Sequence, residues 1–215
     1  MSKPQLYLIT PRIDAPEPFA PPLTAACGAG GLAAILLRLK PADERTLINR
    51  VKSLAAIVQR AEAALLISVD EETLDLPTIA ARGGADGVHA TAPAQLRELR
   101  ERSKGDRILG AGNLRSKHEA MEAGEAGVDY LLFGEPRRDD SVPPLDGVIE
   151  RAAWWAEIFE TPCVAYAPTL EAVPALAATR AEFVALGNAV WTAPAGPADA
   201  LSRAQAALSG AESAP

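Results

Sequence analysis

Short runs of aliphatic and β-branched residues alternate along the chain with longer segments in which apolar residues recur three and four positions apart. The short runs are typical of β-strands, and the longer segments are typical of amphipathic helices with one buried face. Leu47, Val51 and Val58, for example, fall on one side of a predicted helix. The pattern predicts eight strands, at residues 6–10, 33–39, 65–69, 86–89, 107–111, 129–134, 162–166 and 182–187.

The regular order of strand, helix and strand predicts the fold. The predicted strands start about 20 to 35 residues apart, which suits a crossover helix between two parallel strands. Eight such units close into an α/β fold, the (β/α)8 TIM barrel, for which 215 residues suffice. An open doubly wound sheet would carry a Gly-rich turn after its first strand, but residues 10–14 read TPRID. We therefore expect functional side chains at the carboxyl ends of the barrel strands.

Three segments depart from the regular unit. The Pro-rich residues 15–22 predict an irregular loop after the first strand, and residues 137–144 (RRDDSVPP) predict a polar, mobile loop after the sixth. Residues 209–215 are small and polar, which predicts a flexible tail. The sequence thus indicates one barrel domain over residues 1–208, followed by that tail.

Composition and charge limit which classes of partner the protein is expected to bind. The net charge of −7 argues against nucleic acid and against an anionic membrane surface, whereas an anionic small molecule would need a local cluster of Arg or Lys. No apolar run reaches the roughly 20 residues that span a bilayer, and the first residues lack a secretory pattern, so we expect a cytoplasmic protein. Cys27 and Cys163 lie far apart without metal-ligand spacing, and we expect both to be buried and reduced.

Candidate chemistry begins in the second predicted strand. Leu36, Arg38 and Lys40 share one face because side chains alternate with period two. We therefore expect both cations to point into the mouth of the barrel and to clamp an anion, although Lys40 has the alternative role of a solvated charge at the end of the strand. Patterns of other enzyme classes, such as GxSxG, HExxH and the P-loop, do not occur.

Four segments resemble one enzyme family. LYLIT (residues 6–10), LRLK (37–40), GADGVH (84–89) and GVDYLLFG (127–134) resemble the thiamine phosphate synthase family, which includes the TenI thiazole tautomerase, in order and in spacing. The resemblance implies a barrel that binds phosphorylated thiamin precursors. A synthase of this family joins a hydroxymethylpyrimidine diphosphate to a thiazole phosphate and releases pyrophosphate with the help of Mg²⁺.

The resemblance also implies roles for individual residues. Arg38 and Lys40 fall where the family binds the diphosphate, and Asp70 falls where it has a carboxylate for Mg²⁺, although an Asp at this place has the alternative role of a helix cap. His89 is retained at the end of the fourth strand, where a buried structural histidine is the alternative. The second family carboxylate has no counterpart in residues 90–94 (ATAPA).

Further candidates follow the last three strands. Arg137 and Arg138 replace the Thr and Lys of the family loop and are expected to supply cations, with a solvated charge run as the alternative. The Gly-Gly phosphate cradle of the family falls on residues 167–168 (Ala-Pro), where proline has no N–H to donate. Gly187 and Asn188 are then the remaining backbone donors for a phosphate at this end of the barrel.

Two functions follow from these residues. The first is the synthase reaction, and the second is a non-catalytic barrel that binds a thiamin-related or other phosphate ester in a regulatory or salvage role. A different isomerase on the same fold rests on analogy alone. The adjacent Trp154 and Trp155 cannot both face one side of a helix, so we expect one to pack inside and the other to mark a contact surface, as in a homodimer.

Overall fold

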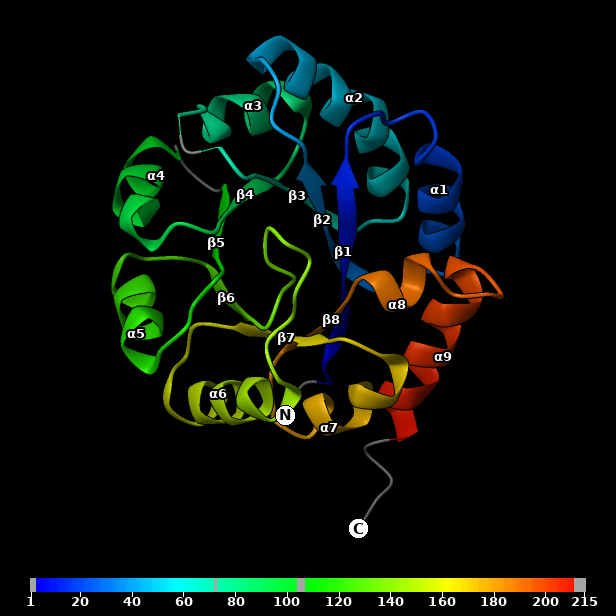
Figure 1. The fold of residues 1–215 in the computed structure, drawn as a ribbon, viewed down its shortest axis with the longest axis vertical. Helices are drawn as coiled ribbons and strands as arrows, with labels where there is room; N and C mark the ends of the chain where they lie inside the picture. Colours follow the sequence, from blue (N-terminus) through cyan, green and yellow to red (C-terminus); the bar gives the residue numbers. More distant parts are fainter. Residues whose placement is uncertain (1–2, 72, 104–106, 211–215) are drawn as a thin grey trace.

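The computed structural model describes residues 3–71, 73–103 and 107–210. Eight parallel strands form a closed barrel in the order β1-β2-β3-β4-β5-β6-β7-β8, and helices form a ring around it (Figure 1). The predicted TIM barrel is confirmed, with a strand at each of the eight predicted places. The strands are β1 (Gln5–Ile13), β2 (Leu32–Leu39), β3 (Ala64–Val69), β4 (Gly87–Ala90), β5 (Ile108–Ala111), β6 (Tyr130–Phe133), β7 (Cys163–Ala167) and β8 (Phe183–Leu186).

The helices lie between the strands as the sequence pattern predicts. They are α1 (Ala20–Gly28), α2 (Glu44–Arg60), α3 (Leu76–Gly83), α4 (Leu96–Arg102), α5 (Lys117–Glu125), α6 (Leu145–Ile158), α7 (Val173–Ala177), α8 (Asn188–Trp191) and α9 (Pro197–Gly210), with short 3₁₀ turns at Pro93–Gln95 and Leu170–Ala172. The side chain of Asp43 caps α2 by accepting a hydrogen bond from the Thr46 backbone N–H at 3.0 Å. In the part of the chain described, no helix is long and apolar enough to cross a bilayer.

Side chains of the strands divide into two buried layers. One layer packs between the strands and the helices and includes Leu6, Leu8 and Leu37. The other fills the inside of the barrel and includes Tyr7, Ile9, Leu36, Leu66 and Tyr130. Neighbouring residues of one strand fall in different layers because side chains alternate across a sheet. Arg38, two residues beyond Leu36, therefore lies above the inner layer at the mouth of the barrel.

Strand β1 extends farther than the sequence predicts. The prediction ended it at Thr10, but Arg12 and Ile13 pair with Arg38 and Leu39 of β2, although Pro11 cannot donate a ladder hydrogen bond. The register shifts between Ile9 and Arg12, so an irregularity in the ladder accommodates the proline. This extension brings a second arginine to the rim of the barrel.

Two other predictions need correction. Helix α1 begins at Ala20, inside the predicted irregular loop of residues 15–22, because proline fits the first turn of a helix. Helix α9 continues through Ser209 to Gly210, where the flexible tail was expected to start, and the Lys3 ammonium donates to the Ser209 hydroxyl at 2.6 Å. The remaining residues of the predicted tail, 211–215, lie outside the described residues.

The structure confirms the buried cysteines and one tryptophan packed inside, and the contact surface expected at the other tryptophan stays a prediction. Cys27 and Cys163 are both buried and free. Trp155 is 1% exposed and stacks on Phe159, whereas Trp154 is half-buried and also contacts the Phe159 ring.

Candidate active site at the mouth of the barrel

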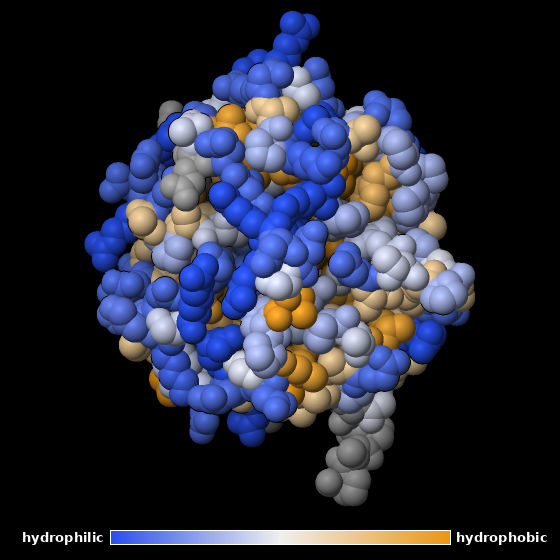
Figure 2. All heavy atoms as spheres, in the orientation of Figure 1, coloured by the Kyte–Doolittle hydropathy of each residue, from blue (hydrophilic) through white to orange (hydrophobic). Residues whose placement is uncertain are grey.

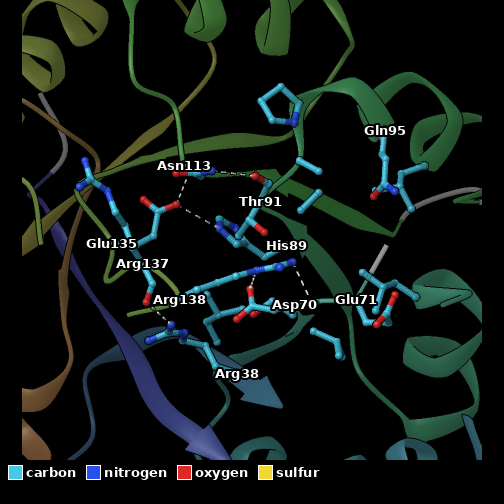
Figure 3. Close-up of a pocket in the computed structure, with 18 of the residues that line it drawn as sticks. Arg38, Asp70, Glu71, His89, Thr91, Gln95, Asn113, Glu135, Arg137 and Arg138 are labelled. Atoms are coloured by element: carbon cyan, nitrogen blue, oxygen red, sulfur yellow. Dashed lines mark hydrogen bonds and ion pairs between the residues drawn. The ribbon is translucent and has the colours of Figure 1, made fainter. Parts of the chain in front are cut away.

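A polar cavity of about 580 Å³ opens at the carboxyl ends of the strands. This volume lies in the usual range of small-ligand sites, roughly 300–1,000 Å³. Its walls come from the ends of β2 to β6 and from the segments that follow these strands, and Figure 3 shows their polar side chains converging. In Figure 2, hydrophilic side chains gather across the middle of this face, above the barrel. The cavity therefore lies where the barrel fold predicts a site.

Arg38 is the most enclosed cation in the cavity. Its side chain is 12% exposed, and one guanidinium nitrogen donates to the backbone carbonyl of Arg137 at 3.2 Å. Its nearest acidic partner is Asp140, 3.8 Å away, whose own side chain is 64% exposed. Burial, followed by the nearby Arg12, lowers the pKa of Arg38. The guanidinium is thus held in place by a neutral carbonyl, and its charge is offset from a distance by Asp70, Asp140 and Glu135.

Arg12 is the cation that sequence reasoning missed. Its guanidinium donates to the same Arg137 carbonyl at 3.0 Å, and its Nε lies 3.4 Å from a carboxylate oxygen of Asp70. The sequence carried no signal for this residue, because strict alternation places Arg12 on the face of Leu8, in the outer layer, and the register shift between Ile9 and Arg12 turns it to the barrel mouth. Because the predicted strand ended at Thr10, Arg12 was not considered as a site residue.

Lys40 does not join Arg38, which corrects the predicted two-cation clamp. Strand β2 ends at Leu39, so the alternation that would orient Lys40 inward stops one residue before it. The side chain is 52% exposed, its ammonium lies 3.8 Å from Asp14, and it does not line the cavity. The observed arrangement matches the alternative of a solvated charge at the strand end.

The segment that follows β6 folds over the barrel mouth (Figure 1). The Arg137 backbone N–H donates to the Ser141 carbonyl at 2.9 Å, and Asp139 accepts from the Ser141 hydroxyl at 2.6 Å, so the segment has its own internal bonds. Arg137 and Arg138 both line the cavity, as predicted for a cation-bearing loop. Within the described chain, Arg137 has no acidic side chain within ion-pair distance.

Asp70 lies at the edge of the cavity, between two arginines. Its carboxylate is 3.4 Å from Arg12 and 3.7 Å from Arg138, and its backbone carbonyl accepts from Arg138 at 2.9 Å. The alternative role as a helix cap belongs instead to Asp75, which caps α3. Among the described residues, no three acidic, histidine or cysteine side chains form a metal-binding cluster. A carboxylate here suits Mg²⁺ only as one ligand beside phosphate and water oxygens.

His89 and Glu135 form the floor of the cavity. His89 is 1% exposed, and its Nδ1 lies 2.9 Å from the Tyr130 hydroxyl, which in turn lies 2.8 Å from the Tyr7 hydroxyl. Its Nε2 has no hydrogen-bond partner and lies 4.0 Å from a carboxyl oxygen of Glu135. Burial, and then Arg38, lowers the pKa of His89 to about 3, so this histidine is neutral at physiological pH.

Glu135 is a second residue that sequence reasoning passed over as a site. Its side chain is 10% exposed, and burial raises its pKa to about 7 even though the Asn113 backbone N–H donates to it. Gly112 makes this arrangement possible, because a Cβ at that position would overlap Glu135 and His89. The signal was a carboxylate two residues beyond the apolar strand β6, after Gly134.

Gly187 and Asn188 lie apart from the cavity lining. Gly187 precedes the short helix α8, and a Cβ there would meet the Tyr166 hydroxyl at 2.9 Å. The cavity is lined mainly from the β2 to β6 side of the barrel, and neither of these two residues lines it.

Comparisons with known proteins agree on one family. A family model described as Thiamine monophosphate synthase matches residues 6–190. A thiamine-phosphate synthase of Rhodospirillum centenum is 40% identical over 201 residues, covering 92% of this chain and 94% of the relative. One of Erythrobacter litoralis is 33% identical over 195 residues, covering 87% and 88%.

A solved structure gives the same result. The thiamine phosphate pyrophosphorylase from Pyrococcus furiosus superposes with a TM-score of 0.77 at 25% identity, and 97% of each chain is covered. A 3-hexulose-6-phosphate synthase from Salmonella typhimurium, at 15% identity and a TM-score of 0.72, shares the fold alone. By sequence match over most of its length, the chain belongs to the thiamine monophosphate synthase/TenI family.

Proposed function

We propose that this protein is a thiamine-phosphate synthase, which joins a hydroxymethylpyrimidine diphosphate to a thiazole phosphate and releases pyrophosphate. The observation that carries the proposal is the arginine cluster at the barrel mouth, formed by Arg12, Arg38, Arg137 and Arg138. Arg12 and Arg38 donate to one backbone carbonyl, at 3.0 and 3.2 Å. Arg12 also contacts Asp70 at 3.4 Å, whereas the ion-pair partner of Arg38 is the exposed Asp140 at 3.8 Å.

The cluster suits a departing diphosphate for a physical reason. Negative charge develops on the leaving group as its bond to the pyrimidine methylene breaks, and guanidinium groups already fixed in place stabilise that charge without reorganising. Arg38 is the best placed for this, because its side chain is enclosed and pairs only loosely with the exposed Asp140. The chain as a whole carries a net charge of −7, so anion binding depends on this local cluster.

The cavity also has a place for Mg²⁺. Asp70 would supply one oxygen ligand, with the remaining ligands from the diphosphate and water. Arg12 and Arg138 would then exchange their contacts with Asp70 for contacts with the diphosphate. When bound, the ion would neutralise part of the leaving group's charge.

The direct test is a synthase assay. Purified protein is mixed with both precursors and Mg²⁺, and thiamin phosphate is measured by fluorescence after oxidation. The Rhodospirillum centenum relative serves as the reference, and Arg38→Ala serves as the variant that lacks the enclosed cation. We expect product that requires both precursors and falls at least about tenfold in the variant, the cost of one charge-assisted contact. Wild-type product no higher than that of a blank without protein refutes the proposal and favours the non-catalytic barrel.

A further inference from the structure

A bulge in β1 determines which face of the strand Arg12 occupies. From Ile9 to Arg12, β1 advances three positions while its neighbour β2 advances only two. One extra residue in a strand shifts the alternation of its side chains by one. Arg12 therefore pairs with Arg38 and faces the mouth of the barrel, whereas unbroken alternation would place it in the outer layer with Leu8.

A side chain from outside the sheet supports the strand at this bulge. The ladder between β1 and β8 ends at the pair Leu8 and Leu186. One residue farther, the Ile9 carbonyl accepts a hydrogen bond from the Trp191 indole N–H at 2.7 Å. Trp191 lies in α8, which is next to β1 in Figure 1, and its ring packs against Phe19 with the ring centroids 4.8 Å apart. The indole therefore satisfies a backbone carbonyl at the point where the ladder with β8 has ended.

Thr10 supports the other side of the same bulge. The residue is 1% exposed, and its hydroxyl oxygen accepts a hydrogen bond from the Arg38 backbone N–H at 3.0 Å. Pro11, the next residue, has no N–H that would need a partner of its own. The bulge thus has two side-chain supports, Thr10 toward β2 and Trp191 toward β8.

We propose that Trp191 and Thr10 are positioning residues for anion binding, because they hold the bulge and the bulge turns Arg12 toward the ligand. The guanidinium held in this way contacts two residues that line the cavity, the Arg137 carbonyl at 3.0 Å and the Asp70 carboxylate at 3.4 Å. Without the bulge the strand would end before Arg12 or regain its alternation, and in either case the guanidinium would leave the cluster. This assignment rests on the proposed function, because it takes Arg12 to bind the diphosphate.

The position of Trp191 gives the assignment a testable consequence. Trp191 does not line the cavity, so an anion bound there is affected by the indole only through the strand that carries Arg12. Loss of the indole N–H should therefore weaken anion binding only while Arg12 is present. Two substitutions that act through one group are not additive, whereas a general loss of structure would weaken binding in either background.

The test is a double-mutant cycle in which pyrophosphate affinity is measured by calorimetry. Trp191→Phe removes the indole N–H and keeps an aromatic ring against Phe19, and Arg12→Ala removes the guanidinium. We expect Arg12→Ala to bind pyrophosphate about tenfold less tightly than wild type, and Trp191→Phe about three- to tenfold less tightly. In the Arg12→Ala background, Trp191→Phe should change the affinity by less than about twofold. The same factor in both backgrounds, or wild-type affinity in either single variant, would overturn the inference.

Matched variants separate positioning from folding. Trp154→Phe makes the same change at a half-buried tryptophan that contacts the Phe159 ring, and it should bind pyrophosphate as wild type does. Thr10→Ser keeps the hydroxyl acceptor and should stay within about twofold of wild type, whereas Thr10→Val leaves the Arg38 N–H without that acceptor and should lose at least about threefold. Urea unfolding shows whether each variant is folded. Thr10→Val with wild-type affinity would contradict the role of Thr10.

Failure of this assignment differs from failure of the proposed function. A wild-type protein that binds no pyrophosphate would refute the arginine cluster, and with it both the proposed function and the role of Trp191. A wild-type protein that binds pyrophosphate, with a Trp191→Phe variant that binds it equally well, would refute the positioning role alone.

Discussion

Glu135→Gln should make the protein more stable at alkaline pH, and the expected gain can be worked out from burial. The side chain is 10% exposed, and burial raises the carboxyl pKa from 4.5 to about 7. Between these pH values the folded state holds a proton that the unfolded chain has released, so stability falls as pH rises through this window. Above about pH 7 the full cost is present, and it corresponds to roughly 3 kcal/mol at about 1.4 kcal/mol for each pH unit.

The variant keeps the shape of the side chain and an acceptor for the Asn113 N–H, but it has no charge to bury. Urea unfolding should therefore show Glu135→Gln more stable than wild type by roughly 3 kcal/mol at pH 8.5 and by less than roughly 1 kcal/mol at pH 5. Glu150→Gln is the control, and its exposed position predicts a change within about 0.5 kcal/mol at both pH values. The reasoning fails if Glu135→Gln is destabilised at pH 8.5, or if its difference from wild type is the same at both pH values.

Three further predictions follow from the same structure. Arg38→Ala should weaken pyrophosphate binding at least about tenfold in calorimetry. Lys40→Ala removes an exposed charge outside the cavity, so its affinity for pyrophosphate should stay within roughly threefold of wild type. Equal losses in the two variants would contradict the conclusion that Lys40 does not join Arg38. Gly112→Ala places a methyl group against Glu135 and His89, so it should destabilise the fold by about 1–3 kcal/mol in urea unfolding. An unchanged free energy of unfolding would contradict the close approach of these three residues. Trp155→Ala should lower the free energy of unfolding by about 3–5 kcal/mol in urea unfolding, because the side chain is 1% exposed and its Nε1 donates to the Thr161 carbonyl at 2.7 Å. A loss below about 1 kcal/mol would contradict its place in the core.

The barrel itself was predictable because its signals are local. Eight short apolar runs separated by helical periodicity leave few alternatives to a closed parallel barrel, and alternation within β2 was enough to direct Arg38 inward. Lys40 was misjudged for a local reason as well, because alternation holds only while the strand continues and β2 ends at Leu39. Arg12 was missed because a register shift allows β1 to continue beyond Pro11, and no sequence pattern announces that shift.

The sequence pointed to His89 as a site residue, but its approach to Glu135 in the floor could not be predicted. His89 lies in β4 and Glu135 comes after β6. The two meet because Gly112, just beyond the intervening strand β5, has no side chain to separate them. Burial of a carboxylate is a property of the assembled barrel. The resemblance to a family gave no direct indication either, since Glu135 lies where that family's loop has other residues.

The most direct test of the arginine cluster is a crystal soaked with pyrophosphate at low ionic strength. The account predicts anion density in the cavity against the Arg38 guanidinium, with Arg137 or Arg138 on its far side and the contact between Arg38 and the Arg137 carbonyl replaced. A cavity free of anion, or an anion bound instead at Gly187 and Asn188, would contradict it.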